Sequence, residues 1–285
     1  MTDAASGFPP QFDQQFRSLI SGSQEGYFGL DVLRGLVEGM NNYRRDHESS
    51  DRGRSLGPAM LGGFLWLDDD ELIEAIAGFP AACVVVSKQQ ASTGRRERKQ
   101  RTFDKLRRVC DSGNGFPAQA CPELSDLAQR DDGRPLVVGP YTHLPDITVP
   151  TFRSIGPRKT GQHLVPILHT KMVLLGNLWW HDEGSAGYPE DVIGFTPEKL
   201  WLASANGTRS SRSNLEFGVW LTDKTLLEMA RGFLTEVICH SEDIDPANDL
   251  FEPELAPYEF DDDTMAEAAE LWGTEVEPDT DDRLP

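Results

Sequence analysis

The spacing of apolar residues divides the first part of the chain into helical segments. Apolar side chains recur at helical spacing between residues 30 and 40 and predict a helix that ends near residue 44. Residues 12–20 are compatible with a shorter helix before it. Residues 49–57 combine Ser, Gly and charged side chains and predict a loop. We therefore expect residues 1–57 to form a helical N-terminal extension.

A different pattern begins at residue 58. Residues 59–66 form a continuous apolar run, and three aspartates, Asp68 to Asp70, follow it with the charge and the capping oxygen that start a helix. Residues 81–86 form a short β-branched run of the kind that is buried in a mixed or parallel sheet. A strand, a helix and a second strand in this order predict a βαβ unit and an α/β fold.

Two polar clusters interrupt the apolar runs between residues 163 and 220. His169, Thr170 and Lys171 separate two strand-like runs, and Ser204 and Asn206 follow a third one. Each cluster lies at the end of a predicted strand, where a polar side chain is held rigidly. After Trp220, apolar residues between positions 226 and 237 recur at helical spacing and predict an amphipathic helix.

The residues of these clusters suit chemistry at phosphorus. A neutral imidazole such as that of His169 is a nucleophile and, once protonated, an acid for a leaving alkoxide. Lys171 lies on the same face of its strand and offsets phosphate charge, while Ser204 and Asn206 donate hydrogen bonds. Glu216 is expected to hold the second imidazole nitrogen. The set lacks the carboxylate cluster of a magnesium or calcium nuclease, so we expect no metal and no cofactor.

The ordered set His169-x-Lys171, Ser204-x-Asn206 and Asn214 to Val219 resembles the signature of the phospholipase D superfamily. The resemblance covers residues 58–239. It implies a mixed β-sheet flanked by helices on both faces, with the histidine, lysine and asparagine around the phosphate and a downstream acid that supports the histidine. Two positions depart from the pattern. The pattern has an acid five residues after the lysine, where this chain has Gly176, and Asp182 is a candidate to take over the role of that acid. Ala203 stands where the pattern has a glycine before the serine.

The chain has one copy of the motif, whereas enzymes that resemble it use two histidines at one site. The resemblance therefore implies a homodimer with a shared site. His169 of one copy would form a phosphohistidine, and His169 of the other copy would act as general acid and then as base.

Composition places the chain among cytoplasmic globular proteins. Hydrophobic residues make up 38% and charged residues 26%, the four cysteines are scattered, and no apolar run has the length of a membrane helix. We expect reduced thiols, a cytoplasmic location and no membrane partner. Residues 58–240 form the expected phospholipase D-like domain, with a basic insert at residues 94–150.

Charge is distributed unevenly along the chain. The formal net charge is -20, but residues 241–285 hold seventeen acids against Arg283 and account for -16, which leaves -4 for the rest. This acidic tail is expected to be disordered. It covers the basic insert, docks on a protein partner or serves only as a solvated tail, three alternatives that the sequence leaves open. The candidate substrate-binding residues lie in that insert and in the loop after Asn206: Arg95, Arg96, Arg98, Lys99, Arg101, Arg209 and Arg212.

These features favour a metal-independent phosphodiesterase that cleaves DNA, in a nucleic-acid-processing or phage-defence system. Two alternatives use the same sequence. One is a phospholipid hydrolase or transphosphatidylase with the same catalytic residues. The other is a non-catalytic, nucleic-acid-binding subunit of a larger complex, which would fit the missing motif acid and the acidic tail.

Overall fold

The computed structural model describes most of the chain. The described residues are 16–21, 24–48, 53–88, 96–111, 114–125, 127–131, 134–135, 147–156, 159–160, 163–164, 168–185, 188–245 and 255–257. Within them, no helix is long and apolar enough to span a membrane.

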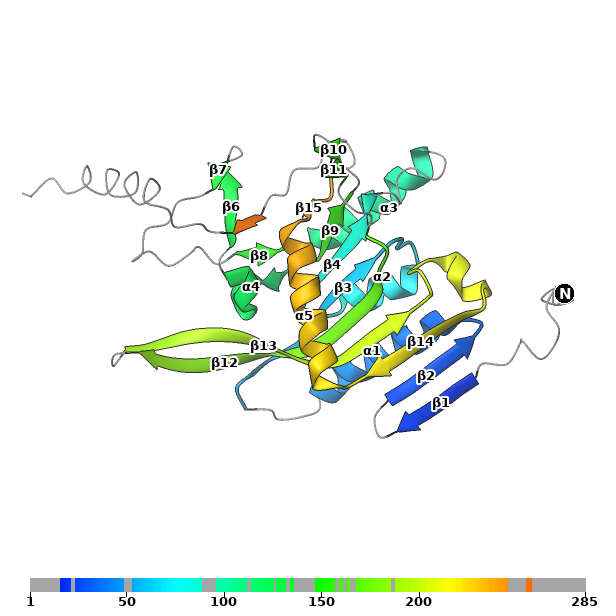
Figure 1. Ribbon diagram of the computed structural model, residues 1–285, viewed down its shortest axis with the longest axis horizontal. Helices are drawn as coiled ribbons and strands as arrows, with labels where there is room; N and C mark the ends of the chain where they lie inside the picture. Colours follow the sequence, from blue (N-terminus) through cyan, green and yellow to red (C-terminus); the bar gives the residue numbers. More distant parts are fainter. Residues whose placement is uncertain are drawn as a thin grey trace, which may run out of the picture.

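A nine-stranded mixed sheet forms the centre of the molecule (Figure 1). Its strands, in spatial order, are β1 (Phe16–Ser21), β2 (Gln24–Gly29), β14 (Glu216–Leu221), β13 (Tyr188–Ala203), β12 (Lys171–Ser185), β3 (Ser55–Phe64), β4 (Ala81–Ser87), β9 (Phe152–Ile155) and β15 (Glu242–Asp243). Strands β3, β4 and β9 are parallel, and the other neighbouring pairs are antiparallel.

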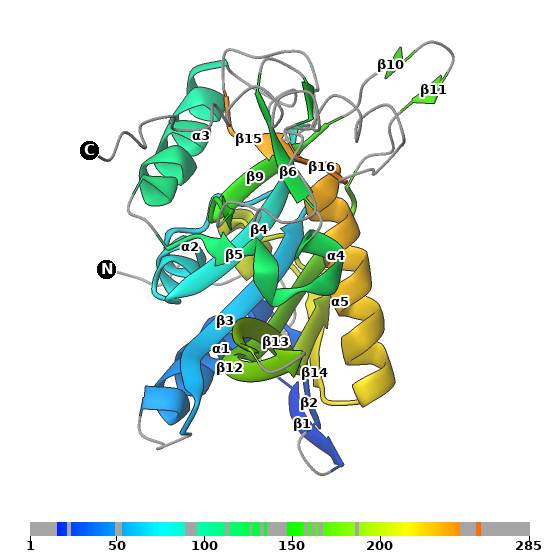
Figure 2. The same cartoon turned by 90° about the vertical axis from the view of Figure 1, so that its left-hand side faces the viewer.

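Helices cover both faces of this sheet (Figure 2). On one face, α1 (Val32–Glu48), α2 (Asp70–Ala77) and α3 (Arg96–Cys110) pack against a core that includes Trp201 and Trp220. On the other face, α4 (Pro122–Ser125), the 3-10 turn η3 (Ala118–Ala120) and α5 (Lys224–Cys239) enclose a second core. The prediction of a mixed sheet with helices on both faces is confirmed.

Short strand pairs complete the described structure. They are β5 (Phe116–Pro117) with β8 (Thr148–Val149), β6 (Leu127–Asp131) with β7 (Arg134–Pro135) and β16 (Leu255–Pro257), and β10 (Lys159–Thr160) with β11 (His163–Leu164).

The predicted βαβ unit is present as β3, α2 and β4. Ala59 lies opposite Ala81 in the parallel pair, and every residue of β4 is buried, as its β-branched composition indicates. Asp69 caps α2: its Oδ1 accepts a hydrogen bond of 3.0 Å from the backbone N–H of Leu72.

The expected helix over residues 12–20 is wrong where the structure describes it. Phe16–Ser21 form β1, and β2 pairs along its length with β14. Strand pairing with the rest of the sheet outweighs local helical propensity here. The N-terminal segment therefore extends the central sheet, and only α1 retains the predicted helical form. Further along the chain, α4 ends at Ser125 and β6 begins at Leu127.

The acidic tail is ordered at its start, contrary to the expected disorder from residue 241. Strand β15 pairs with β9, and the buried Arg153 donates to Ser241 Oγ at 2.7 Å and to Asp243 Oδ1 at 2.5 Å. Glu242 also forms an ion pair with Lys88. The guanidinium of Arg153 is stable in its buried position only because these partners replace the water that it loses. Residues 241–243, which supply them, are therefore part of the folded domain. Residues 246–254 and 258–285 lie outside the described residues.

Candidate functional site

The predicted catalytic residues lie at one end of the strands, where the four neighbouring strands β3, β12, β13 and β14 begin or end. Lys171 starts β12 opposite Phe64, which ends β3. Ala203 ends β13 opposite Gly218, two residues after β14 begins at Glu216. Because these strands are neighbours in the order β3, β12, β13, β14, the segments around Lys171, Ser204 and Glu216 are brought together.

His169 and Lys171 contact each other at this edge. The Nζ atom of Lys171 lies 3.2 Å from Nδ1 and 3.3 Å from Nε2 of the exposed His169 ring. An ammonium can only donate, so the nitrogen that accepts from it is unprotonated. Burial lowers the pKa of Lys171, and the charge of Glu216 acts in the opposite direction.

Glu216 interacts with Ser204 rather than with His169. Its Oε2 accepts a hydrogen bond of 2.5 Å from Ser204 Oγ, and the same hydroxyl oxygen accepts one of 3.0 Å from the backbone N–H of Phe217. The expected hydrogen bond from the imidazole to Glu216 is not present among the described residues, and the carboxylate accepts from Ser204 instead. A backbone hydrogen bond from Ser204 to Phe217 holds the two segments together. The Glu216 carboxylate thus interacts with two of the predicted site residues, Lys171 through its charge and Ser204 through a hydrogen bond.

The Oδ1 atom of Asn206 is buried and has no hydrogen-bond partner among the described residues. Two other buried atoms nearby in the same loops, Thr170 Oγ1 and Trp66 Nε1, share this property. The loops are joined by backbone hydrogen bonds from Leu65 to Thr170 and from Gly207 to Trp66. Buried polar atoms are almost always paired, so these three atoms leave hydrogen-bonding capacity unused at this end of the strands.

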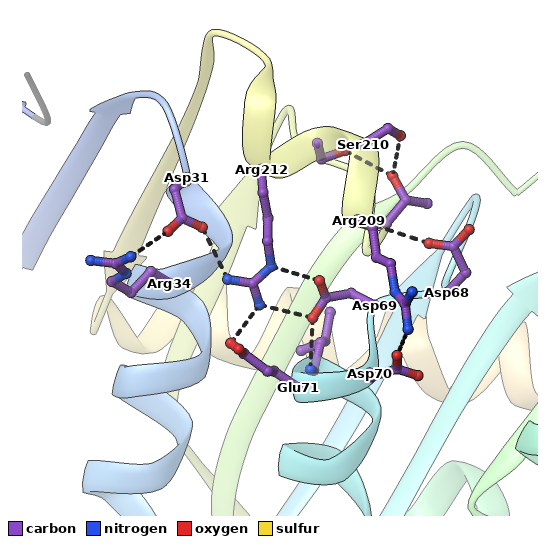
Figure 3. Close-up of polar contacts among 12 residues, drawn as sticks. Asp31, Arg34, Asp68, Asp69, Asp70, Glu71, Arg209, Ser210 and Arg212 are labelled. Carbon is purple, nitrogen blue, oxygen red and sulfur yellow. Dashed lines mark hydrogen bonds and ion pairs between the residues drawn. The ribbon is translucent and has the colours of Figure 1, made fainter. Parts of the chain in front are cut away.

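Arg212 holds the loop after Asn206 in place (Figure 3). From the 3-10 turn η4 (Arg209–Ser213), its Nε donates to Asp69 Oδ2 at 2.6 Å and its Nη2 to Asp69 Oδ1 at 2.8 Å. It also contacts Asp31 at 3.0 Å and Glu71 at 2.9 Å. Its donors are occupied by three carboxylates, which argues against the predicted substrate contact and assigns Arg212 a structural role.

The pKa shifts of Asp69 and Arg212 are consistent with a pair in which both side chains stay charged. Burial favours the neutral form of Asp69, but the hydrogen bonds from Arg212 and from the Leu72 N–H outweigh it, and the pKa of Asp69 is lowered. The hydrogen bond to Asp69 raises the pKa of Arg212. Sequence reasoning took Asp69 only as a helix cap and missed its partner, because nothing in the local pattern links residues 69 and 212.

Arg209 is the more exposed of the two loop arginines. Its guanidinium pairs with Asp70, which also pairs with Lys105 of α3, and its backbone N–H donates to Asp68 Oδ1 at 3.0 Å. The side chain of Arg209 is 65% exposed and stays accessible to a ligand. Since Lys105 and Arg209 share Asp70, the basic helix α3 lies beside the site loop.

The basic insert is described only in part. Residues 96–110 form α3, with Arg101 exposed and Phe103 and Leu106 buried in the core. Arg95 and the side chains of Arg96, Arg98 and Lys99 lie outside the described residues. Their roles as substrate contacts stay predictions.

The position of the missing motif acid has no room for a side chain. A Cβ atom on Gly176 would lie 2.3 Å from the Thr196 carbonyl oxygen and 2.5 Å from the Phe195 ring. Asp182, the suggested substitute, lies six residues further along β12, paired with Asp191 in the outer part of the β12–β13 hairpin. That is about 20 Å from Gly176 at the rise of a strand, so Asp182 does not fill the role.

Neither a protein-family model nor a curated protein matches the chain. Among solved structures, the chain is similar to NucT from Helicobacter pylori, with 11% identity, a TM-score of 0.39 and coverage of 78% of this chain and 99% of that chain. TrmBL2, an archaeal chromatin protein with a novel mode of DNA binding, has 11% identity, a TM-score of 0.33 and coverage of 79% and 56%. Polyphosphate kinase from Porphyromonas gingivalis has 13% identity, a TM-score of 0.32 and coverage of 75% and 25%. These likenesses are too distant to assign a family or an activity.

Proposed function

We propose that the protein is a metal-independent phosphodiesterase that cleaves nucleic acid with His169 as its nucleophile. The observation that carries the proposal is the contact of Lys171 Nζ with the His169 ring at 3.2 Å, at the sheet edge that also holds Ser204, Asn206 and Glu216. This arrangement matches the residue order of the phospholipase D signature that the sequence resembles.

The chemistry follows from the protonation states at this edge. The unprotonated nitrogen of His169 attacks phosphorus, a P–N bond forms, and the P–O bond to the leaving alkoxide breaks. Lys171 then turns from the imidazole to a phosphate oxygen, where its charge stabilises the transition state. Asn206 contributes its side-chain amide, since a half-turn of this group presents its NH2 donor in place of the unpartnered Oδ1 atom.

The leaving alkoxide needs a proton, and this chain offers one histidine of the required kind. His169 of a second copy supplies that proton and then removes one from the water that hydrolyses the phosphohistidine. Glu216 has a supporting role in this scheme. Its charge favours the protonated form of Lys171, and it fixes the Ser204 hydroxyl at 2.5 Å.

Nucleic acid is the favoured substrate because of α3. This basic helix lies beside the loop of Arg209, and basic residues next to a phosphodiester site supply affinity for a polyanionic backbone. The first alternative is hydrolysis of phospholipid, which uses the same catalytic residues. The experiment therefore has to distinguish it from cleavage of nucleic acid. The second alternative is a protein that binds nucleic acid without cleaving it.

The test is cleavage of plasmid DNA, single-stranded DNA and phospholipid vesicles in EDTA by wild type, His169→Ala and His240→Ala. His240 is a matched control, because it is exposed and lies at the end of α5, paired with Glu236. We expect DNA cleavage by wild type and His240→Ala and a loss of at least about 100-fold in His169→Ala. Hydrolysis of phospholipid alone would show that the protein is a phospholipase. Absence of activity on all three substrates would favour a non-catalytic, nucleic-acid-binding subunit.

A further inference from the structure

Asp70 binds two cations that come from different segments of the chain. Its Oδ1 atom forms an ion pair with the Nζ atom of Lys105 in α3. Its Oδ2 atom forms a second ion pair with the guanidinium of Arg209 in η4 (Figure 3). In the part of the chain that the structure describes, neither cation contacts another carboxylate. Two cations therefore share the two oxygens of one small anion.

This ion-pair cluster is open to solvent, unlike the contacts of Arg212. The side chains of Lys105, Asp70 and Arg209 are 33%, 41% and 65% exposed. By contrast, Arg212 is 24% exposed and donates to three carboxylates. Ion pairs between exposed side chains contribute little to stability, because water competes with both partners. Another anion can therefore replace the Asp70 carboxylate at small cost.

The cluster lies beside the candidate site. Leu67, before α2, and Gly207, after β13, form a parallel bridge, and the Gly207 carbonyl accepts a hydrogen bond of 2.9 Å from the backbone N–H of Asp68. Arg209 follows Asn206 by three residues, so their backbones lie within about 11 Å of each other. Successive phosphates of one nucleic-acid strand advance by about 3.4 Å each. A strand with one phosphate at Asn206 therefore brings further phosphates to the cluster.

We propose that Lys105 and Arg209 form a subsite for a backbone phosphate that flanks the scissile one, and that Asp70 occupies this subsite in the free protein. The inference rests on the proposed function, in which the scissile phosphate lies at His169. A phosphodiester presents two oxygens that share one negative charge, as a carboxylate does, and arginine and lysine bind both groups. A phospholipid with a single phosphodiester has no second phosphate for the subsite. The subsite therefore favours a polynucleotide.

This exchange gives Asp70 an effect on binding that is opposite to that of its two partners. Loss of Lys105 or Arg209 removes one phosphate contact. Such a loss weakens binding and makes it less dependent on salt, because each contact releases counterions from the nucleic acid. Loss of the Asp70 charge frees both cations for phosphate and strengthens binding.

The test measures binding of labelled duplex DNA by fluorescence anisotropy between about 50 and 200 mM salt. All proteins are full-length chains that carry His169→Ala, so that the DNA is not cleaved. Lys105→Ala and Arg209→Ala should each weaken binding about tenfold at the lowest salt and reduce the slope of log affinity against log salt by about 0.9. Lys224→Ala is the control, because this exposed lysine begins α5 on the opposite face of the sheet from α3, and it should leave the slope unchanged.

Asp70→Asn should raise the DNA affinity about fivefold at the lowest salt. Glu74→Gln removes the same charge from an exposed position one turn further along α2, and it should change the affinity less than about twofold. In a chain with both Lys105→Ala and Arg209→Ala, Asp70→Asn should have no larger effect than Glu74→Gln, because the cations that it restrains are gone. Arg209→Lys keeps the charge and should keep the wild-type slope.

Circular dichroism checks the folding of each variant. Lys105→Met and Arg209→Met keep a long side chain without its charge, and they replace the alanine variants if those do not fold.

Unchanged slopes in Lys105→Ala and Arg209→Ala, equal effects of Asp70→Asn and Glu74→Gln, or absence of DNA binding overturn the proposal. If the alanine variants weaken binding to phosphatidylglycerol vesicles but not to DNA, the subsite takes a lipid headgroup, and the proposal is again overturned. Chains with intact His169 test the proposed function separately. Reduced slopes without any DNA cleavage by such chains support the subsite and contradict the phosphodiesterase. Cleavage with unchanged slopes supports the phosphodiesterase and contradicts the subsite.

Discussion

Arg212 and Asp69 form a two-pronged ion pair that joins the loop of the candidate site to the first turn of α2. The two hydrogen bonds measure 2.6 Å and 2.8 Å, and the Asp69 side chain is only 4% exposed. Planar, doubly bonded pairs of this kind fix orientation as well as distance. The segment from Ser204 to Ser213 is therefore held against α2 while its site residues face the sheet edge.

Loss of this pair should destabilise the protein. Arg212→Ala leaves the buried Asp69 carboxylate without its main partner, and removal of one member of a buried pair costs about 3 kcal/mol. Urea denaturation followed by circular dichroism measures the change in the free energy of unfolding.

Arg34→Ala is the matched control. Arg34 also pairs with Asp31, at 3.0 Å, but its side chain is 61% exposed, and exposed pairs contribute little. We expect its free energy of unfolding to stay within about 0.5 kcal/mol of wild type. Equal losses in the two variants would contradict a special role for Arg212.

The same pair makes stability depend on pH. The pKa of Asp69 is lowered from its ordinary value of 3.8, so in acid the unfolded state takes up this proton first. The stabilisation is fully present above pH 3.8 and is lost as the pH falls through the folded-state pKa. We expect Asp69→Asn to be about 2 kcal/mol less stable than wild type at pH 7, with a gap that narrows below pH 3.8. A gap that stays constant down to pH 2 would show that Asp69 is not responsible.

Gly176 should resist substitution. A methyl group there meets the Thr196 carbonyl and the Phe195 ring inside the sheet, so we expect Gly176→Ala to lose about 1–3 kcal/mol of stability. Gly232 in α5 is the control, because a Cβ at that position meets no atom within 4 Å apart from its chain neighbours and the adjacent backbone of its own helix. Gly232→Ala should gain about 0.5–1 kcal/mol, since alanine favours a helix. Thermal melting of both variants measures the contrast, and a neutral Gly176→Ala would show that β12 shifts to make room.

The acidic tail gives a prediction at low salt. Residues 258–285 hold eleven acids and one base, for a net charge of -10, and we propose that they compete with nucleic acid for the basic helix α3. The truncation should begin after Pro257, because β16 pairs with β6 and Leu255 is buried in the core. We expect the truncated chain to bind DNA more tightly at about 50 mM salt and like wild type at about 0.5 M, in a fluorescence anisotropy titration. Equal DNA affinities of the truncated chain and wild type at low salt would contradict the proposed competition.

The sequence was informative where chemistry is local and periodic. The β3–α2–β4 unit follows from an apolar run, a capping aspartate and a β-branched run, all within thirty residues. The placement of the polar clusters at strand ends follows from the runs that flank them. By contrast, the strand pairing of β2 with β14 joins residues nearly two hundred positions apart, and no local pattern encodes it.

The same limit explains the errors within the site. Residue order predicts that Glu216 holds the imidazole, but the register of β13 and β14 brings Ser204 into hydrogen-bond distance of this carboxylate. Its place as a cation near Asn206 in the sequence predicts that Arg212 contacts substrate. Its three carboxylate partners come from segments that only the folded sheet brings together.

The central claim is that His169 attacks a phosphodiester and carries it as a phosphoramidate. Wild type and His169→Ala are mixed with end-labelled DNA in EDTA, quenched within milliseconds in alkaline denaturant, in which phosphohistidine persists, and digested for mass spectrometry. We expect a transient nucleotide adduct on the peptide that contains His169, and neither adduct nor cleavage in His169→Ala. Cleavage by His169→Ala at the wild-type rate, with no adduct in either protein, would contradict it.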